Sequence, residues 1–504
     1  MTIIKFKRWC IFLILAWLPG YFGNTNISFT EEPGPFEWVR IWDVYCGSDV
    51  AISPEGGIYV AGYFCEYEGE INLTLRSGAK SLNSSGCDDG FLICAGQDGF
   101  IESALSLGGP GCDQALGVTV DDRGEIFITG YFSGKMDFDP GPKEESREAL
   151  GYEDAFVLKL DSHASYEWVA TFGGVGGDAK GYDIVVEPTG EVVLCGSFQG
   201  PMDFDPGDNE DVKTSIDDPD GGISYADGFV IKLTPEGTYC WGIVIGSEGL
   251  DGAFKVAMNS NKDIFILGNF ICDSPDTLSV FGKSITGKYQ VTTNGYDDIF
   301  LVMLDSNGDP CWLSNFGGVS DDCAAGLAVD STAGIFITGS LSAPDYTNHI
   351  KIPLTTASDY PVTFLANIDF AGKVRWINSW GPRNSAWAAS CAVSSNGFAY
   401  VLGSFSGAVD FDPGTSEEVH SSRGGWNDNR LFITKYNVNG QFKGAWTWKG
   451  DITGAAMNII SKDIDTIYVL GQSPYGATLG ADSDANTTTA TKGFGTFLAK
   501  FATR

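Results

Sequence analysis

The sequence predicts an all-β fold, a seven-bladed β-propeller of four-stranded antiparallel blades whose ring is closed by the N-terminal strand. Three observations lead to this prediction. A strand-and-turn motif recurs at a long and nearly constant period, which indicates a repeat architecture. Each repeat has four strand-like segments and no room for an ordinary helix. The last repeat lacks its fourth strand, and one extra strand precedes the first repeat.

The first observation is a motif that follows a strand. Asp-Phe-Asp-Pro-Gly occurs at 137–141, 203–207 and 410–414. Each copy comes after a short run of β-branched and aromatic residues that ends in glycine, which is typical of a strand followed by a turn. With or without the motif, such runs end at seven glycines spaced by 64 to 72 residues: Gly62, Gly130, Gly196, Gly268, Gly339, Gly403 and Gly471. The chain therefore has seven units.

The second observation is the content of each unit. An alternating strand precedes the glycine strand, as at 116–121, and another strand follows it, as at 155–160. We name the strands A to D in chain order. Four short strands with turns between them are typical of a propeller blade. The D strand begins near a tryptophan, which we expect to pack between blades, with stacking on a sugar as the alternative: Trp168, Trp241, Trp312, Trp376 and Trp446.

The third observation concerns the two ends of the chain. The last unit stops after its C strand at 496–501, and residues 36–42 precede the first unit and resemble a D strand. The N-terminal strand is therefore predicted to complete the last blade, with Trp38 in the position of Trp168. Residues 29–504 then form a single propeller domain, and closure leaves no open sheet edge.

Residues 1–28 have the features of a secretory signal. Lys5, Lys7 and Arg8 form a positive segment, and an apolar run at 9–18 follows it. The run is too short to span a bilayer, so we predict a signal peptide and no membrane span. The protein is then expected to be secreted, extracellular or at the cell surface.

Eleven of the 12 cysteines follow this signal. Export permits disulfides. Cys65 and Cys87 bracket the B–C loop of the first blade, and we expect a bridge between them. Cys240 and Cys311 occupy equivalent D-strand positions in neighbouring blades, which should be too far apart to pair.

The formal net charge of −34 limits the possible partners. Binding to nucleic acid needs clustered lysine and arginine, so no nucleic-acid partner is expected. The simplest interpretation is a well-solvated surface on a monomer. The 3 histidines are isolated and no nucleophile motif is present, so no catalytic or cofactor site is predicted.

The motif aspartates are the candidate metal ligands. In an up-and-down blade the D–A and B–C loops emerge on one side of the disc, and both loop types are rich in aspartate. We hypothesise that Ca²⁺, which favours clustered carboxylates, binds there. The alternative is that these side chains accept hydrogen bonds from nearby backbone N–H groups and shape the turn. The candidate ligands are Asp137, Asp139, Asp203, Asp205, Asp410 and Asp412.

These features together resemble a known repeat. Phe-Gly-Gly segments at 172–174 and 316–318, an alternating strand, the glycine strand and Asp-Phe-Asp-Pro-Gly are similar to the SBBP-type β-propeller repeat of exported bacterial and archaeal proteins. The resemblance covers nearly all of 36–504 and is strongest in units 2, 3 and 6. It implies a propeller and an extracellular setting, and no common activity.

We therefore expect an exported, non-catalytic binding or interaction scaffold, with an extracellular protein or a glycan as its ligand. The alternative is a polysaccharide-acting enzyme that uses carboxylates on the acidic loop face. An enzyme should show converging carboxylates whose pKa values are pushed apart, whereas a scaffold need not.

Overall fold

The structure of this protein is a computed structural model. It describes residues 36–502 except 66–70, 217–224, 272–276, 282–288, 294–295, 319, 342–345, 348–349, 352–361, 381–385, 423–429, 448–455, 462, 465, 474–477, 480–487 and 490–494. The predicted signal at 1–28 lies outside the described residues. Within them, no helix is long and apolar enough to cross a membrane.

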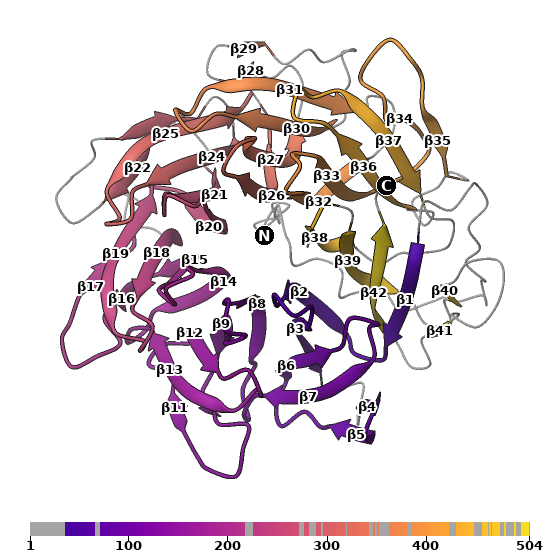
Figure 1. The fold of residues 1–504 in the computed structure, drawn as a ribbon. Coiled ribbons are helices and arrows are strands. Elements are labelled where there is room, and N and C mark those ends of the chain that lie inside the picture. Colours follow the sequence, from indigo (N-terminus) through magenta and orange to yellow (C-terminus); the bar gives the residue numbers. More distant parts are fainter. Residues whose placement is uncertain are drawn as a thin grey trace, which may run out of the picture.

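Seven four-stranded antiparallel blades surround a central axis, which confirms the predicted fold class (Figure 1). The innermost A strands of blades 1 to 7 are β2 (Cys46–Ile52), β8 (Gln114–Val120), β14 (Asp178–Val186), β20 (Leu250–Met258), β26 (Cys323–Asp330), β32 (Ala386–Val393) and β38 (Ala456–Ser461). The B strands are β3 (Ile58–Cys65), β9 (Ile126–Phe132), β15 (Val192–Gln199), β21 (Ile264–Ile271), β27 (Gly334–Leu341), β33 (Ala399–Phe405) and β39 (Thr466–Ser473).

The two outer strands of each blade follow the same order. The C strands are β6 (Asp88–Ala95), β12 (Asp154–Leu160), β18 (Asp227–Leu233), β24 (Asp297–Leu304), β30 (Val362–Ile368), β36 (Arg430–Tyr436) and β42 (Gly495–Ala502). The outermost D strands are β7 (Ile101–Leu107), β13 (Tyr166–Phe172), β19 (Tyr239–Gly246), β25 (Pro310–Gly317), β31 (Val374–Trp380), β37 (Phe442–Thr447) and, for blade 7, β1 (Phe36–Trp42).

Short hairpins extend the B–C loops of six blades. They are β4 (Ile71–Leu75) with β5 (Gly78–Leu82), β10 (Lys135–Asp137) with β11 (Ser146–Glu148), β16 (Pro201–Asp203) with β17 (Val212–Thr214), β22 (Thr277–Phe281) with β23 (Gln290–Thr292), β34 (Ala408–Asp410) with β35 (Val419–Ser421), and β40 (Thr478–Leu479) with β41 (Thr488–Thr489). In blade 5, β28 (Tyr346–Thr347) and β29 (Ile350–Lys351) pair with each other in this loop, and β28 also pairs with β25 of blade 4.

The core lies between the blades, because each inner strand buries both of its faces. In β9, Ile126 and Ile128 pack toward blade 1, whereas Phe127 packs toward blade 3. This explains why the B strands are continuous apolar runs. The described residues form seven hydrophobic clusters, one for each contact between neighbouring blades, which we call a seam.

The predicted closure of the ring is confirmed. The N-terminal strand β1 pairs antiparallel with β42, the C strand of blade 7, and Trp42 lies opposite Thr496 (Figure 1). Trp38 lies opposite Lys500, as Trp168 lies opposite Lys159 in blade 2, so its predicted position is also correct. Both faces of blade 7 are thereby covered, because β1 contributes Val39 to one seam and Trp38 to the other.

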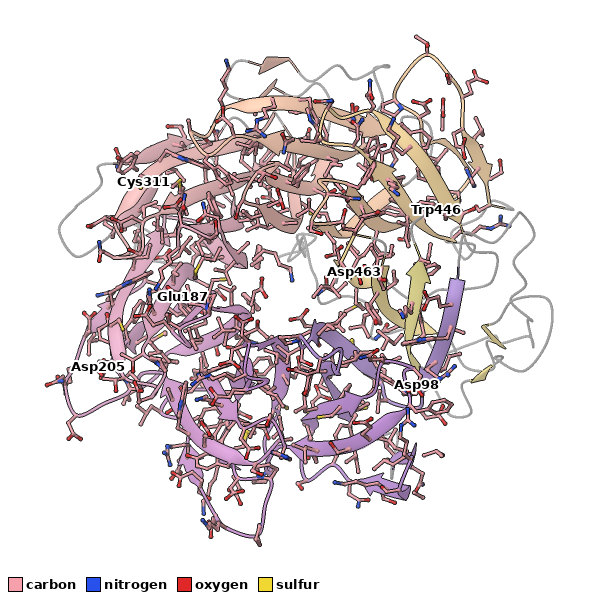
Figure 2. The ribbon with its side chains drawn as sticks, viewed as in Figure 1. Asp98, Glu187, Asp205, Cys311, Trp446 and Asp463 are labelled. Atoms are coloured by element: carbon pink, nitrogen blue, oxygen red, sulfur yellow. The ribbon has the colours of Figure 1, made fainter. Side chains whose placement is uncertain are left out.

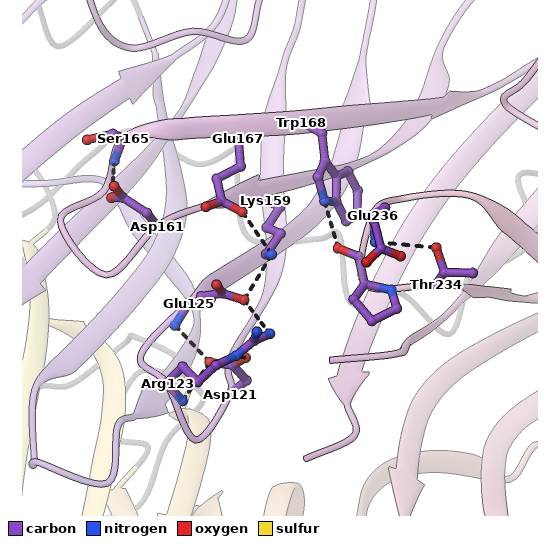
Figure 3. A network of polar contacts seen from close by, with 11 residues as sticks. Asp121, Arg123, Glu125, Lys159, Asp161, Ser165, Glu167, Trp168, Thr234 and Glu236 are labelled. Atoms are coloured by element: carbon purple, nitrogen blue, oxygen red, sulfur yellow. Dashed lines mark hydrogen bonds and ion pairs between the residues drawn. The ribbon is translucent and has the colours of Figure 1, made fainter. Parts of the chain in front are cut away.

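Five D-strand tryptophans join neighbouring blades, as the packing interpretation predicts. Each indole N–H donates to a backbone carbonyl in the C–D turn of the next blade; Trp168 donates to Pro235 at 3.0 Å (Figure 3). The indole also lies against the glycine that ends this turn, and we call this arrangement the indole latch. Its donor and acceptor pairs are Trp38–Gln97, Trp168–Pro235, Trp241–Ser306, Trp312–Phe370 and Trp376–Val438.

Within the described residues, no indole latch is present at two seams. In blade 6 the position opposite Lys435 is Gly444, and Trp446 lies two residues further along, so Trp446 is not equivalent to the other tryptophans. The chain ends meet in blade 7, so no C–D turn is available there to receive an indole. Between blades 1 and 2 the turn is present, yet Ser103 replaces the tryptophan.

The residue that ends the C–D turn is glycine where an indole packs against it and alanine at the seam where none does. Gly237, at a φ of +80°, lies so close to Trp168 that an added Cβ would be 2.9 Å from the ring. At the seam without an indole, the same position is Ala164, with a φ of 61°. The sequence therefore tolerates a Cβ at this position only where no indole occupies the space.

Replacing Gly237 with alanine is expected to destabilise the protein by about 3 kcal/mol, because a left-handed backbone disfavours a Cβ and the ring must move. The matched change Ala164→Gly should alter the free energy of unfolding by less than about 0.5 kcal/mol. Urea unfolding of both variants measures this difference. Equal effects of the two changes would contradict the proposed role of the indole.

Candidate functional site

The D–A and B–C loops emerge on one side of the disc, as predicted, and we call this side the loop face. Ser133 of a B–C loop accepts a hydrogen bond through Oγ from the Cys112 N–H of a D–A loop at 2.7 Å. One blade further on, the N–H of Asp203 donates to the carbonyl of Gly173 at 3.0 Å. In blades 2 and 3 the D–A loop thus contacts the B–C loop of the blade that it enters.

The three Asp-Phe-Asp-Pro-Gly segments form the same turn. In the first copy, Asp137 Oδ1 accepts hydrogen bonds from the N–H groups of Asp139 and Glu145, at 3.1 and 2.8 Å. Asp139 Oδ1 accepts from Gly141 N–H at 2.7 Å. The phenylalanine between the two aspartates is fully buried, at Phe138, Phe204 and Phe411. The other two copies repeat these bonds.

The six candidate calcium ligands do not converge on one site. The turns lie in blades 2, 3 and 6 at the periphery of the disc, and Figure 2 shows Asp205 far from the central opening. Their hydrogen bonds are those expected of turn-shaping aspartates. Over the part of the chain that the structure describes, no group of three or more histidine, cysteine or acidic side chains could hold a metal ion. Calcium binding at Asp137, Asp139 and their counterparts stays a prediction.

The D–A loop aspartates are also bound to the backbone. Asp113 accepts hydrogen bonds from Gly109 N–H at 2.6 Å and Ser133 N–H at 3.1 Å, and burial raises its pKa to about 6. Asp251 accepts from Ser247 N–H and Asp322 from Gly318 N–H, at 2.6 and 2.8 Å. These three side chains hold the glycine-rich loops in shape.

A pair of acidic side chains at the seam between blades 2 and 3 has a different environment from these loop aspartates. Asp178 lies near Glu153, and burial followed by the Glu153 charge raises the pKa of Asp178 to about 6. Lys180 forms an ion pair with Glu153 and lies 4.2 Å from the centre of the Tyr131 ring. The charge of Lys180 partly offsets the raised pKa of Asp178.

The most exposed large hydrophobic side chains of the described residues gather next to this pair. They are Val175, Tyr152 and Leu150, which are 81%, 77% and 61% exposed, and we call them the seam patch. The two loops that carry them are in contact, because Tyr152 N–H donates to the carbonyl of Gly177 at 3.0 Å. Three exposed apolar side chains on touching loops, beside two carboxylates, thus lie on the loop face.

A second polar group lines the central opening, where each A strand has a bulge at an equivalent position. At several blades the side chain after the bulge is hydrogen-bonded to a neighbouring blade. Asp49 accepts a hydrogen bond from Val118 N–H of blade 2 at 2.8 Å, and Asp183 accepts from Val256 N–H of blade 4 at 2.9 Å. We call these residues the channel ring: Asp49, Gly117, Asp183, Lys255, Gly326, Ser390 and Asn458.

The charges of the channel ring compensate one another. Burial raises the pKa of Asp183 to about 6 and also raises that of Asp49, and the charge of Lys255 partly offsets both shifts. For Lys255 burial acts to lower the pKa, but the two carboxylates outweigh it and raise the pKa. One lysine of blade 4 therefore neutralises aspartates of blades 1 and 3.

The sequence analysis missed both the channel ring and the seam patch. The available signal for the ring was a polar residue at the start of the alternating A strand, as in Gly47-Ser48-Asp49-Val50 and Gly181-Tyr182-Asp183-Ile184. For the patch, the signal was the pair of apolar residues Leu150 and Tyr152 in a glycine-containing loop.

Two comparisons with known proteins bear on the fold. No family model matches the chain, so the SBBP-type resemblance stays a hypothesis. The chain is 22% identical over 244 residues to an uncharacterized WD repeat-containing protein of Acanthamoeba polyphaga mimivirus; the match covers 44% of this chain and 17% of the viral protein. With the seven blades described above, this similarity supports the conclusion that the chain is a β-propeller repeat protein.

Proposed function

We propose that this protein is an exported, non-catalytic scaffold that binds a protein partner through the seam patch on its loop face. The propeller fold and the similarity to a WD repeat-containing protein support a role in protein interaction. The location outside the cell is inferred from the signal-like residues 1–28.

The seam patch is the observation that carries this proposal. Large apolar side chains that are exposed singly are normal, but a contiguous group of them is typical of an interaction site. Val175, Tyr152 and Leu150 are the three most exposed of their kind in the described chain, and they lie on two touching loops.

The surroundings of the patch favour a partner segment with basic and apolar side chains. Glu153 and Asp178 supply carboxylates beside the patch, and the exposed ring of Tyr152 can accept a cation on its face. The net charge of −34 adds long-range attraction for a basic segment. A glycan, which could also stack on Tyr152, is the alternative ligand.

The channel carboxylates have structural roles and do not form an acid and base pair. The pKa values of Asp49 and Asp183 are both raised, rather than pushed apart as an acid and a base require. Each of these carboxylates accepts a hydrogen bond from the backbone of the next blade. They act as links between blades.

Selection of a random peptide library on the immobilised full chain tests the proposal. The enriched peptides should contain lysine or arginine beside aromatic or aliphatic residues. The double variant Tyr152→Ser/Val175→Ser should bind them at least about ten-fold more weakly, which corresponds to the loss of about 1.4 kcal/mol. Glu153→Gln should weaken binding mainly at low salt.

Ile464→Ser is the matched control, because Ile464 is 52% exposed and lies in an A–B turn on the opposite side of the disc. Its binding should equal that of the unchanged protein. The proposal is wrong if no peptide is enriched, or if the patch variant binds as well as the control. Binding only on a glycan array, with or without Ca²⁺, would replace the protein partner with a sugar.

A further inference from the structure

The seam between blades 1 and 2 has a complete C–D turn but no indole latch. Ser103 occupies the tryptophan position of blade 1, and Ala164 occupies the turn position that faces it. At the other seam without an indole, between blades 6 and 7, the chain ends meet and β1 is paired directly. The seam between blades 1 and 2 is therefore the one where another kind of link between the blades would add most stability.

Two cysteines lie across this same seam on the loop face. Cys87 directly precedes β6 of blade 1, and Cys112 is in the D–A loop that enters blade 2. The backbones there pair as a parallel bridge, with Asp88 opposite Cys112. Cys87 N–H donates to the carbonyl of Gly111 at 2.9 Å, and Asp113 N–H donates to that of Asp88 at 2.7 Å.

This pairing places the two cysteines on adjacent backbones, with Cys87 next to the residue that lies opposite Cys112. Adjacent β-strands lie about 5 Å apart, and disulfides span Cα separations of about 4.4–6.8 Å. The thiols are in contact, and burial followed by the thiol of Cys87 raises the pKa of Cys112 to about 12. Cys65, Cys87 and Cys112 are all free thiols in this structure, and the thiol of Cys112 lies against that of Cys87, so the Cys65–Cys87 bridge stays a prediction.

The equivalent positions at three other seams carry different residues. The same backbone hydrogen bond recurs there, from Ala179 to Glu153, from Asp251 to Ala226 and from Asp322 to Asp297. It aligns Cys87 and Cys112 with the residue pairs Tyr152 and Asp178, Tyr225 and Leu250, and Tyr296 and Asp321. Two cysteines therefore face each other at the seam that lacks an indole, and none of these three seams carries such a pair.

We propose that Cys87 and Cys112 form a disulfide that fastens blade 1 to blade 2 in place of the missing indole latch. The oxidant is a small-molecule or protein disulfide. The exposed thiolate of Cys87 attacks it and releases one thiolate, giving a mixed disulfide. The sulfur of Cys112 then attacks the Cys87 sulfur and releases the second thiolate, so the oxidant gains two electrons and the two cysteine thiols lose two protons.

The test uses the full chain incubated with oxidised glutathione and digested without reductant. Mass spectrometry should find one peptide pair joined through Cys87 and Cys112. Reductant should lower the melting temperature by a few degrees, and the variant Cys87→Ser/Cys112→Ser should melt at this lower temperature with or without reductant. The control Cys240→Ser/Cys311→Ser should respond to reductant as the unchanged protein does.

A rescue variant tests the compensation itself. Adding Ser103→Trp and Ala164→Gly to the serine variant supplies an indole latch at this seam, and it should restore at least half of the lost melting temperature. Absence of that recovery would overturn the compensating role. The disulfide itself is excluded if both thiols remain open to alkylation after oxidation, or if Cys87 is instead linked to Cys65.

Discussion

Deletion of residues 29–42 is expected to lower the melting temperature of the protein by about 5–10 °C and to cause aggregation. The deletion removes β1, and with it the buried side chains of Trp38, Val39 and Trp42. Each contributes about 1.5–3 kcal/mol through burial, so the sum is a large part of the about 5–15 kcal/mol that stabilises a typical domain. Differential scanning calorimetry and size-exclusion chromatography measure the two effects.

The aggregation has a specific cause. Without β1, strand β42 becomes an open edge with unpaired N–H and C=O groups, which can pair with another chain. The matched control is deletion of residues 1–28, which should leave the melting temperature unchanged. A synthetic peptide of residues 36–42 should partly restore the stability of the longer deletion. Equal melting temperatures for the two deletions would show that β1 does not close the ring.

Replacing Lys255 with methionine is expected to destabilise the protein by about 3 kcal/mol at pH 8, because two buried aspartates lose the charge that compensates them. The effect should depend strongly on pH. The folded-state pKa of Asp183 is about 6, above its ordinary value of 3.8, so the folded state binds the proton more tightly than the unfolded state. Stability therefore falls as pH rises from about 4 to about 6.

Lys255 limits this fall. Without it the pKa values of both aspartates rise further, so the loss becomes steeper and extends above pH 6. Below about pH 4 the aspartates are neutral and the substitution should have little effect or be stabilising. Melting temperatures between pH 4 and pH 8 test this, with Lys135→Met as the control, since Lys135 forms only an exposed ion pair. A loss that is the same at all pH values would contradict the charge compensation.

The sequence was sufficient to predict the parts of the fold that repeat. Runs such as Ile126–Thr129 before Gly130 have one pattern in seven places, so the blade number and strand order could be counted. The position of Trp38 followed from the same alignment. Trp446 was wrongly grouped with the other tryptophans. It lies in a D strand, as they do, but two residues further along, so it has a different cross-strand partner.

The site features depend on contacts that no local pattern encodes. Lys255 comes from blade 4 and Asp49 from blade 1, about 200 residues apart, and only the closed ring brings them to one channel. The proximity of Cys87 to Cys112 was not predicted, because the loops of adjacent blades pair across the seam. For Asp137 and its counterparts, the sequence left two interpretations open, and the observed bonds to N–H groups agree with the turn-shaping one.

The pairing of β1 with β42 also sets the order in which the molecule can assemble. During synthesis residues 36–42 are made long before their partner at 496–501. Until residues 496–501 are made, β1 has no pairing partner, while the intervening blades can already pack against one another. Long-range strand pairing of this kind is slow and leaves edges open to misassembly. Ring closure should thus be the final and rate-limiting step of folding, and a chain released before residue 496 would remain an open arc.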